Sequence, residues 1–165
     1  MLKDKWKNKT GDYNYINEQF RSIRQDMTIQ NIKNEFTVKV YETHARIALE
    51  CYDIDQFNQC QTKLIDLYND KLPGKEIEFM AYRIIYTSLQ NIRYDMENLL
   101  RNLKRRNLGK NIEIAHALKC HKALNEFNYY EFFKLYKIAP NMGAYLIEPF
   151  LPKLRIRALH VAAVG

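Results

Sequence analysis

The stretch that decides the fold is residues 22–68, which read SIRQDMTIQNIKNEFTVKVYETHARIALECYDIDQFNQCQTKLIDLY. Its apolar residues recur at helical spacing, which predicts two amphipathic helices joined by a turn. Thr28 is predicted to cap the first helix and Asp53 the second, with Gln56 completing a capping box. The residues predicted to face inward are Ile29, Ile32, Phe36, Val40, Ile47 and Cys51 in the first helix, and Ile54, Phe57, Cys60, Leu64 and Tyr68 in the second.

The helix-turn-helix pattern returns later in the chain. Residues 48–57 read ALECYDIDQF, and residues 123–132 read ALNEFNYYEF, an offset of 75 residues. Asn128 would be the second N-cap and Glu131 its capping-box partner. Two units of roughly 34–40 residues each account for this offset, as in tetratricopeptide-like proteins. We therefore predict an all-α fold in which helical hairpin repeats stack into a right-handed solenoid.

The same spacing predicts helices over most of the remaining chain. Further apolar stripes lie at 16–27, 77–89, 96–103, 112–124, 129–138, 145–150 and from 153 onward. We expect more than roughly 60% helix and no three-stranded sheet. Residues 1–14 are expected to be poorly ordered or extended, and residues 15–165 to form one helical-repeat domain.

Charge is distributed unevenly along the chain. The net charge is +7, but residues 1–100 hold fourteen Lys and Arg against fifteen Asp and Glu, whereas residues 101–165 hold twelve against four. A basic end indicates either a polyanionic partner or a solvated basic surface. The densest basic run is Arg101, Lys104, Arg105, Arg106 and Lys110. Together with Arg155 and Arg157, these are the candidate nucleic-acid-binding residues, because exposed cations reach phosphates without reading sequence.

The aromatic residues near the second repeat turn allow two interpretations. Rings beside cations can form a base-stacking platform for single strands. Their spacing is instead mostly that of a helix core, which favours packing. The residues concerned are Phe127, Tyr129, Tyr130, Phe132, Phe133 and Tyr136.

Cysteine and histidine spacing predicts no metal site. Cys51, Cys60 and Cys120 are odd in number, form no Cys-x-x-Cys pair and lie in apolar helical patterns, which is typical of reduced core thiols. His116 and Cys120 share one helical face beside His121, but no second pair supplies the ligands that zinc needs. Reduced thiols indicate the cytosol or nucleus. No apolar run reaches the ~18 residues of a membrane span, so no membrane partner is expected.

A catalytic pair of His44 and Cys60 is not supported either. A nucleophilic cysteine needs a base that a third group orients, and no such Asn or Asp is identifiable. We expect His44 to join Glu42 and Arg46 in a polar network between helices. The sequence thus predicts a protein with no catalytic residue and no cofactor, which is not an enzyme.

Two segments resemble a known family. Residues 22–68, and residues 132–140 (FFKLYKIAP) with the Met142, Tyr145-Leu146 and Arg155/Arg157-Ala-Leu159 positions that follow, are similar to the helical region of the SAC/GANP family. Their order and spacing match over most of residues 15–160. The amino-acid sequence of these segments is most similar to the branch that pairs with a COP-signalosome-like subunit in transcription elongation and mRNA processing.

The resemblance implies a fold, a role and partners. Members scaffold nuclear complexes that couple transcription to mRNA processing and export, with or without shuttling to the cytoplasm. Their PCI domain is a helical-repeat half followed by a winged helix. It pairs with a second PCI-domain protein and a small acidic companion subunit, and it binds RNA or DNA. This chain is expected to be the helical half, with the winged helix missing. A PCI subunit of the proteasome lid or of a translation initiation factor complex remains the alternative.

Overall fold

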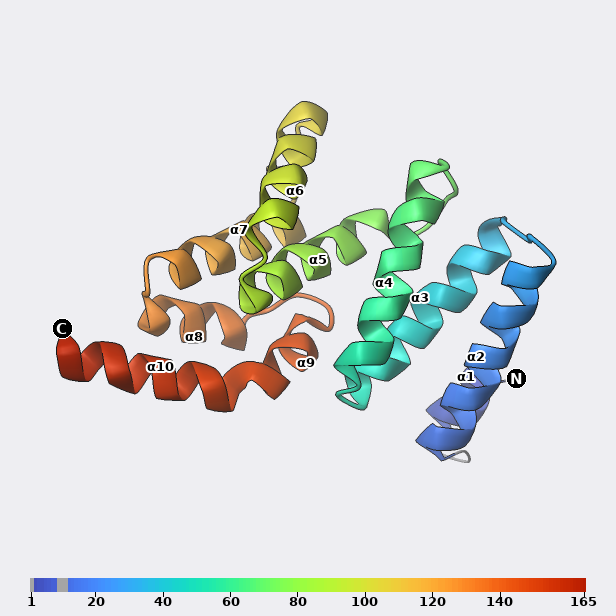
Figure 1. Cartoon of the computed structure of the whole chain (residues 1–165), viewed down its shortest axis with the longest axis horizontal. Helices are drawn as coiled ribbons and strands as arrows, with labels where there is room; N and C mark the ends of the chain where they lie inside the picture. The colour runs from blue at the N-terminus through green and yellow to red at the C-terminus, as the bar shows by residue number, and fades with distance from the viewer. Residues whose placement is uncertain (1, 9–11) are drawn as a thin grey trace. The chain divides into compact units, whose positions relative to one another are not determined.

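The computed structural model describes residues 2–8 and 12–165 of the chain. Every regular element in these residues is helical and none is a strand (Figure 1). This confirms the predicted all-α class. The elements are α1 (Leu2–Lys7), α2 (Tyr13–Ile29), α3 (Glu35–Glu50), α4 (Ile54–Asn69), α5 (Glu76–Gln90), α6 (Arg93–Arg106), α7 (Ile112–Asn125), α8 (Tyr129–Lys137), α9 (Gly143–Ile147), the 3-10 helix η1 (Glu148–Phe150) and α10 (Leu151–Val164).

The chain divides into two compact units, Met1–Glu76 (unit 1) and Ile77–Gly165 (unit 2). In unit 1, α3 packs along α4, α2 packs on α3, and α1 contacts α2. In unit 2, α7 and α8 form a hairpin, α8 contacts α9, and η1 joins α9 to α10. The two hairpins α3–α4 and α7–α8 are the ones that carry the internal repeat.

The hydrophobic core of each unit lies between its hairpin and the neighbouring helices. In unit 1, Leu49 of α3 and Phe57 and Leu64 of α4 are fully buried. In unit 2, Ile114 of α7 and Phe132 of α8 are fully buried as well. Burial of each such side chain stabilises the fold by roughly 1.5–3 kcal/mol. The apolar residues at these positions are therefore buried, as the helical spacing of the sequence predicts.

The N-terminal segment differs from the prediction for residues 1–14. Residues 2–7 form helix α1, and α2 already begins at Tyr13. The indole Nε1 of Trp6 donates a hydrogen bond to Glu50 Oε2 over 2.6 Å, and its ring meets Tyr13 edge-on. These contacts hold α1 against α2 and α3, which local sequence did not reveal. Residues 1 and 9–11 lie outside the described residues.

The boundary between the first two long helices was wrong in the prediction. Thr28 does not cap a helix, because α2 runs through it to Ile29 and its hydroxyl donates to the Arg24 carbonyl over 2.9 Å. The cap is Asn34, whose side chain accepts from the N–H of Thr37 in a complete capping box. The predicted inward residues Ile29 and Phe36 are consequently 73% and 61% exposed.

The two predicted repeat turns share one backbone geometry. Tyr52 and Phe127 have φ of 58° and 54°, the left-handed conformation that commonly ends a helix. The residue after each, Asp53 or Asn128, donates its N–H to a carbonyl of the preceding helix over 2.9 and 2.8 Å. These turns lie 75 residues apart, as the sequence repeat requires, and the same left-handed conformation also occurs at Asn31, Lys71, Asn91, Asn107 and Asn141.

Both predicted N-caps are confirmed. Asp53 Oδ1 accepts from the N–H of Gln56 over 3.1 Å, and Asn128 Oδ1 accepts from the N–H of Glu131 over 3.2 Å. The capping-box role of Gln56 and Glu131 was wrong, because the cap N–H groups already donate to the preceding helix. The Gln56 side chain instead donates to Gln59 Oε1.

Removal of these caps should destabilise the protein unequally. Asn128→Ala is expected to cost ~1 kcal/mol, the usual loss for an N-cap. Asp53→Ala should cost about twice that, because Asp53 Oδ2 also accepts from the Tyr13 hydroxyl over 2.6 Å. Burial, with this bond, raises the pKa of Tyr13. Urea unfolding measures the losses, with the exposed neighbour Asp55→Ala as control. Losses under about 0.3 kcal/mol at both caps would contradict the assignment.

Candidate nucleic-acid interface

The predicted basic run lies on the last turns of α6 and in the turn after it. Met96 and Leu103 are the buried residues of α6, so the other faces of this helix carry its polar side chains. The helix ends where Asn107 takes a φ of 52° and Leu108 donates its N–H to the Leu103 carbonyl. All five cations are exposed: Arg101, Lys104, Arg105, Arg106 and Lys110.

Some of these cations also have local structural roles. Arg101 lies 3.5 Å from Glu97 one helical turn earlier, with both side chains well exposed, a pair that contributes roughly 0.5 kcal/mol or less. Lys104, Arg105 and Arg106 occupy the last turn, where a cation stabilises the negative end of the helix by about 0.3–1 kcal/mol. Neither role withdraws the charges from solvent, so phosphates can still approach them.

The two remaining candidates lie elsewhere in unit 2. Arg155 and Arg157 are exposed on α10. Figure 1 shows the C-terminal end of α6 pointing away from α10, so the structure does not bring the seven candidates into one surface. Arg157 lines a groove together with residues of α5, α6 and α7, and Arg155 does not. The basic run on α6 is therefore the better candidate for phosphate contacts.

The aromatic residues divide between core and surface. Tyr129 and Phe132 are buried, as core packing predicts. Phe127 and Tyr130 are 63% and 73% exposed, so core packing was wrong for them. Lys134 Nζ lies 4.4 Å from the centre of the Tyr130 ring. One exposed ring with one cation falls short of a platform for successive bases.

The histidines and cysteines of unit 2 serve structural bonds. His116 Nε2 lies 2.8 Å from the Leu135 carbonyl, which joins α7 to α8. Burial raises the pKa of the Cys120 thiol to about 12.

Within residues 2–8 and 12–165, no group of three or more His, Cys, Asp and Glu side chains is placed to hold a metal ion. In the same residues no helix is long and apolar enough to span a membrane.

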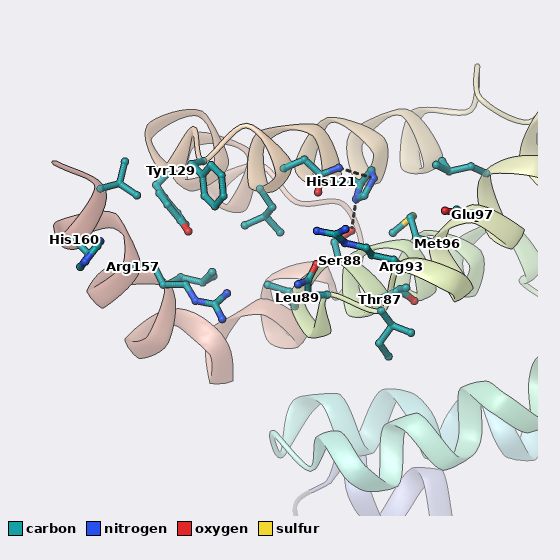
Figure 2. Close-up of a pocket in the computed structure, with 18 residues that line it drawn as sticks. Thr87, Ser88, Leu89, Arg93, Met96, Glu97, His121, Tyr129, Arg157 and His160 are labelled. Atoms are coloured by element: carbon teal, nitrogen blue, oxygen red, sulfur yellow. Dashed lines mark hydrogen bonds between the residues drawn. The ribbon is translucent and has the colours of Figure 1, made fainter. Parts of the chain in front are cut away.

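His121 joins α7 to α5 (Figure 2). Its Nδ1 lies 3.0 Å from Ser88 Oγ, and its Nε2 lies 3.0 Å from Asn125 Nδ2. The Ser88 hydroxyl donates to the Ile84 carbonyl, so Ser88 accepts from Nδ1–H and Nε2 accepts from Asn125. Burial lowers the pKa of His121. The ring is accordingly neutral, and both of its nitrogens are used.

Arg24 links α2 to both helices of the first hairpin. Its Nη1 lies 3.2 Å from His44 Nδ1 and 3.0 Å from Cys60 Sγ. His44 Nε2–H donates to Asn17 Oδ1 over 2.7 Å, and the ring stacks on Phe20. Burial, with the charge of Arg24, lowers the pKa of His44 to about 3, and burial raises that of Cys60 to about 11. A thiol and an imidazole that both stay neutral are suited to packing.

The predicted polar network forms around Glu42 without His44. Glu42 Oε1 accepts from the Tyr68 hydroxyl over 2.7 Å and from the N–H of Lys75 over 2.6 Å. Arg46 lies 3.6 Å from the other carboxylate oxygen. His44 belongs to the Arg24 network, so its predicted place was wrong. Glu42 is 5% exposed, and these bonds offset the loss of its hydration.

His44 should make stability depend on pH. Its pKa in the folded protein is below its ordinary value of about 6.5, so below pH 6.5 the unfolded chain binds a proton that the folded chain excludes. The free energy of unfolding should therefore be highest above pH 6.5 and fall by up to ~1.4 kcal/mol per pH unit as pH decreases to 5. Urea unfolding across this range measures it. His44→Gln should remove most of this slope, because only the contribution of His121, whose pKa burial also lowers, is left. The exposed control His160→Gln should keep the slope; equal slopes in all three proteins would refute the prediction.

Comparison with known proteins places the chain among related sequences. The model of the SAC3/GANP family matches residues 1–165. A THP3 homologue of Schizosaccharomyces pombe is 48% identical over 159 residues, which cover 96% of this chain and 40% of the relative. The leukocyte receptor cluster member 8 homologue of Xenopus laevis is also 48% identical over 159 residues, which cover 96% of this chain and 20% of the relative. Protein THP3 of Saccharomyces cerevisiae is 48% identical over 91 residues, 54% of this chain and 19% of the relative. The chain thus spans less than half the length of these relatives.

Proposed function

Because the chain belongs to the SAC3/GANP family, we propose that it is part of a non-catalytic scaffold subunit of a nuclear complex that couples transcription to mRNA processing and export. The observation that carries the proposal is the family match over all 165 residues. Similarity to relatives named THP3 supports a place in the branch that acts in transcription elongation and mRNA processing.

The proposed architecture is the helical half of a PCI domain over residues 15–165, which a winged helix would follow. In it, tetratricopeptide-like hairpins stack into a right-handed solenoid. Two features support this. The hairpins α3–α4 and α7–α8 each place an N-cap after a left-handed residue, at positions 75 residues apart. Each hairpin buries its apolar face against further helices of its own unit, as a repeat protein does.

A scaffold role also suits the chemistry of the described residues. Buried thiols and imidazoles among them form hydrogen bonds between helices, whereas many lysine and arginine side chains are exposed to solvent. The proposed partners are a second PCI-domain protein, a small acidic companion subunit and RNA or DNA. Phosphates would meet the basic run on α6, and Arg155 and Arg157 would form a separate secondary contact. No cofactor and no membrane are part of the proposal.

RNA binding and cellular association test this proposal. The first test measures RNA affinity with and without the basic run, and affinity should fall when these cations are replaced by glutamate. The second asks what the protein associates with in cells. An RNA-dependent nuclear association is expected. Co-sedimentation with proteasomes or with small ribosomal subunits would instead favour the alternative, a PCI subunit of the proteasome lid or of a translation initiation factor complex.

A further inference from the structure

Unit 2 contains an open groove of about 750 Å³ (Figure 2). The end of α5 and the start of α6 form one side of its lining, the end of α7 and the start of α8 another, and α10 a third. All of its residues lie between 87 and 161, so unit 2 alone builds it. The sequence offered no sign of this groove, because its lining comes from five helices distant along the chain.

Half of the lining is apolar, and most of that half is aliphatic: Leu89, Ile92, Met96, Leu100, Leu124, Leu154 and Val161. Met96 and Leu154 are buried within it, whereas Leu100 and Val161 are 36% and 38% exposed and so offer apolar surface to a ligand. Phe127, at the turn before α8, is 63% exposed. Apolar side chains gathered in a concave surface are typical of a binding site, whereas single exposed ones are ordinary.

The charge at the groove is positive. Arg93 and Arg157 line it, are exposed, and have no carboxylate partner among the described residues. Glu97 is the one carboxylate of the lining, and it is already paired with Arg101. His121 adds no charge, since its two nitrogens are bonded and its pKa is lowered by burial. Residues 77–165 as a whole hold fourteen Lys and Arg against seven Asp and Glu.

We propose that this groove binds an acidic amphipathic helix of a protein partner. Leucine-like side chains of that helix would enter between α6 and α10, and its carboxylates would meet Arg93 and Arg157 (Figure 2). A groove that combines apolar side chains with charged ones suits an amphipathic helix, which carries both kinds of side chain. Single-stranded RNA fits less well, because successive bases need several aromatic faces, whereas Phe127 and His160 are the exposed rings of the lining and Tyr129 is buried. The inference rests on the proposed scaffold role and adds to it a site on this chain and the kind of element that the site binds.

The test uses the full chain and a labelled synthetic peptide of about four helical turns. The peptide carries leucines along one face and glutamates on the others, and fluorescence anisotropy measures its affinity. Arg157→Glu and Leu100→Gln should each weaken binding roughly tenfold, through lost charge complementarity and lost apolar contact. The matched controls are Arg155→Glu on the same helix and Ile112→Gln, an exposed residue outside the groove. Both controls should bind as the unaltered chain does.

Four further probes make the result decisive. A peptide of the same composition with its leucines scattered should bind at least about tenfold more weakly, and so should one with lysines in place of glutamates. Replacement of Lys104 and Arg105 by glutamate should leave peptide affinity unchanged. The peptide experiment therefore tests the groove independently of whether the basic run binds RNA. Equal peptide affinity for groove and control variants would overturn the inference. A single-stranded uridine oligonucleotide that displaces the peptide from the unaltered chain, and that no longer binds the Arg157→Glu variant, would also overturn it. The groove would then be a nucleic-acid site.

Discussion

Replacement of Arg101, Lys104, Arg105 and Arg106 together by glutamate should weaken binding to single-stranded RNA about a hundredfold at low salt. The four side chains are exposed at one end of α6, so their cations can contact phosphates without any change of fold. Each phosphate contact contributes about 0.7 to the slope of log affinity against log salt concentration for a single strand. Loss of four contacts should therefore flatten that slope by about 3. RNA affinity of the unaltered chain and of the fourfold variant, each measured at two salt concentrations, gives both the loss of affinity and the change in the salt slope.

A second fourfold variant separates position from net charge. Glutamates at Lys119, Lys122, Lys134 and Lys137, four exposed residues on α7 and α8, change the net charge by the same amount. This control should lose far less affinity and keep most of the salt slope. Circular dichroism should show unchanged helix content in the control and at most the loss of the last turn of α6 in the basic-run variant, because the cations of that turn stabilise the helix end by about 0.3–1 kcal/mol each. Equal affinity of the basic-run variant and the unaltered chain would show that these cations only stabilise the end of α6.

Gly74→Ala should destabilise unit 1 by about 2–3 kcal/mol or more. A Cβ atom at Gly74 would lie 2.5 Å from Val38 Cγ1, 2.6 Å from Glu42 Oε1 and 3.0 Å from Tyr68 Cε1. None of these atoms can retreat easily. Val38 is fully buried, and Glu42 accepts hydrogen bonds from the Tyr68 hydroxyl and the N–H of Lys75. The added methyl group would overpack this site. If Glu42 moved away to make room, it would lose a hydrogen bond to its buried carboxylate, which costs roughly 1–3 kcal/mol.

Urea unfolding followed by the fluorescence of Trp6, the single tryptophan of the chain, measures this loss directly in unit 1. Gly109→Ala is the matched control, because nothing lies within 4 Å of a Cβ atom at that position. It should change stability by less than about 0.5 kcal/mol. A Gly74→Ala protein as stable as this control would show that the segment after α4 does not pack closely on α3.

The amino-acid sequence by itself determined the helices and the turns whose chemistry is local. Apolar spacing predicts α5 and the hairpins α3–α4 and α7–α8, because one buried face at 3.6-residue spacing is sufficient to place a helix. Asp53 and Asn128 were predictable as caps, since a short polar side chain serves the nearest N–H groups. The exposure of the basic run was predictable too, because so many cations in ten residues cannot all be buried.

Only the tertiary structure decided the features that depend on residues far apart in the chain. Thr28 and Asn34 both have cap chemistry, and the choice between them follows from the packing of α2 on α3. His44 pairs with Asn17 and Arg24 rather than with nearby Glu42, since helix packing determines which polar groups share a buried space. The groove in unit 2 depends in the same way on five helices meeting, and the contacts at Gly74 on the close approach of α3 and α4. Periodicity shows that a helix face is buried, but the residues that cover it are determined by how the helices pack.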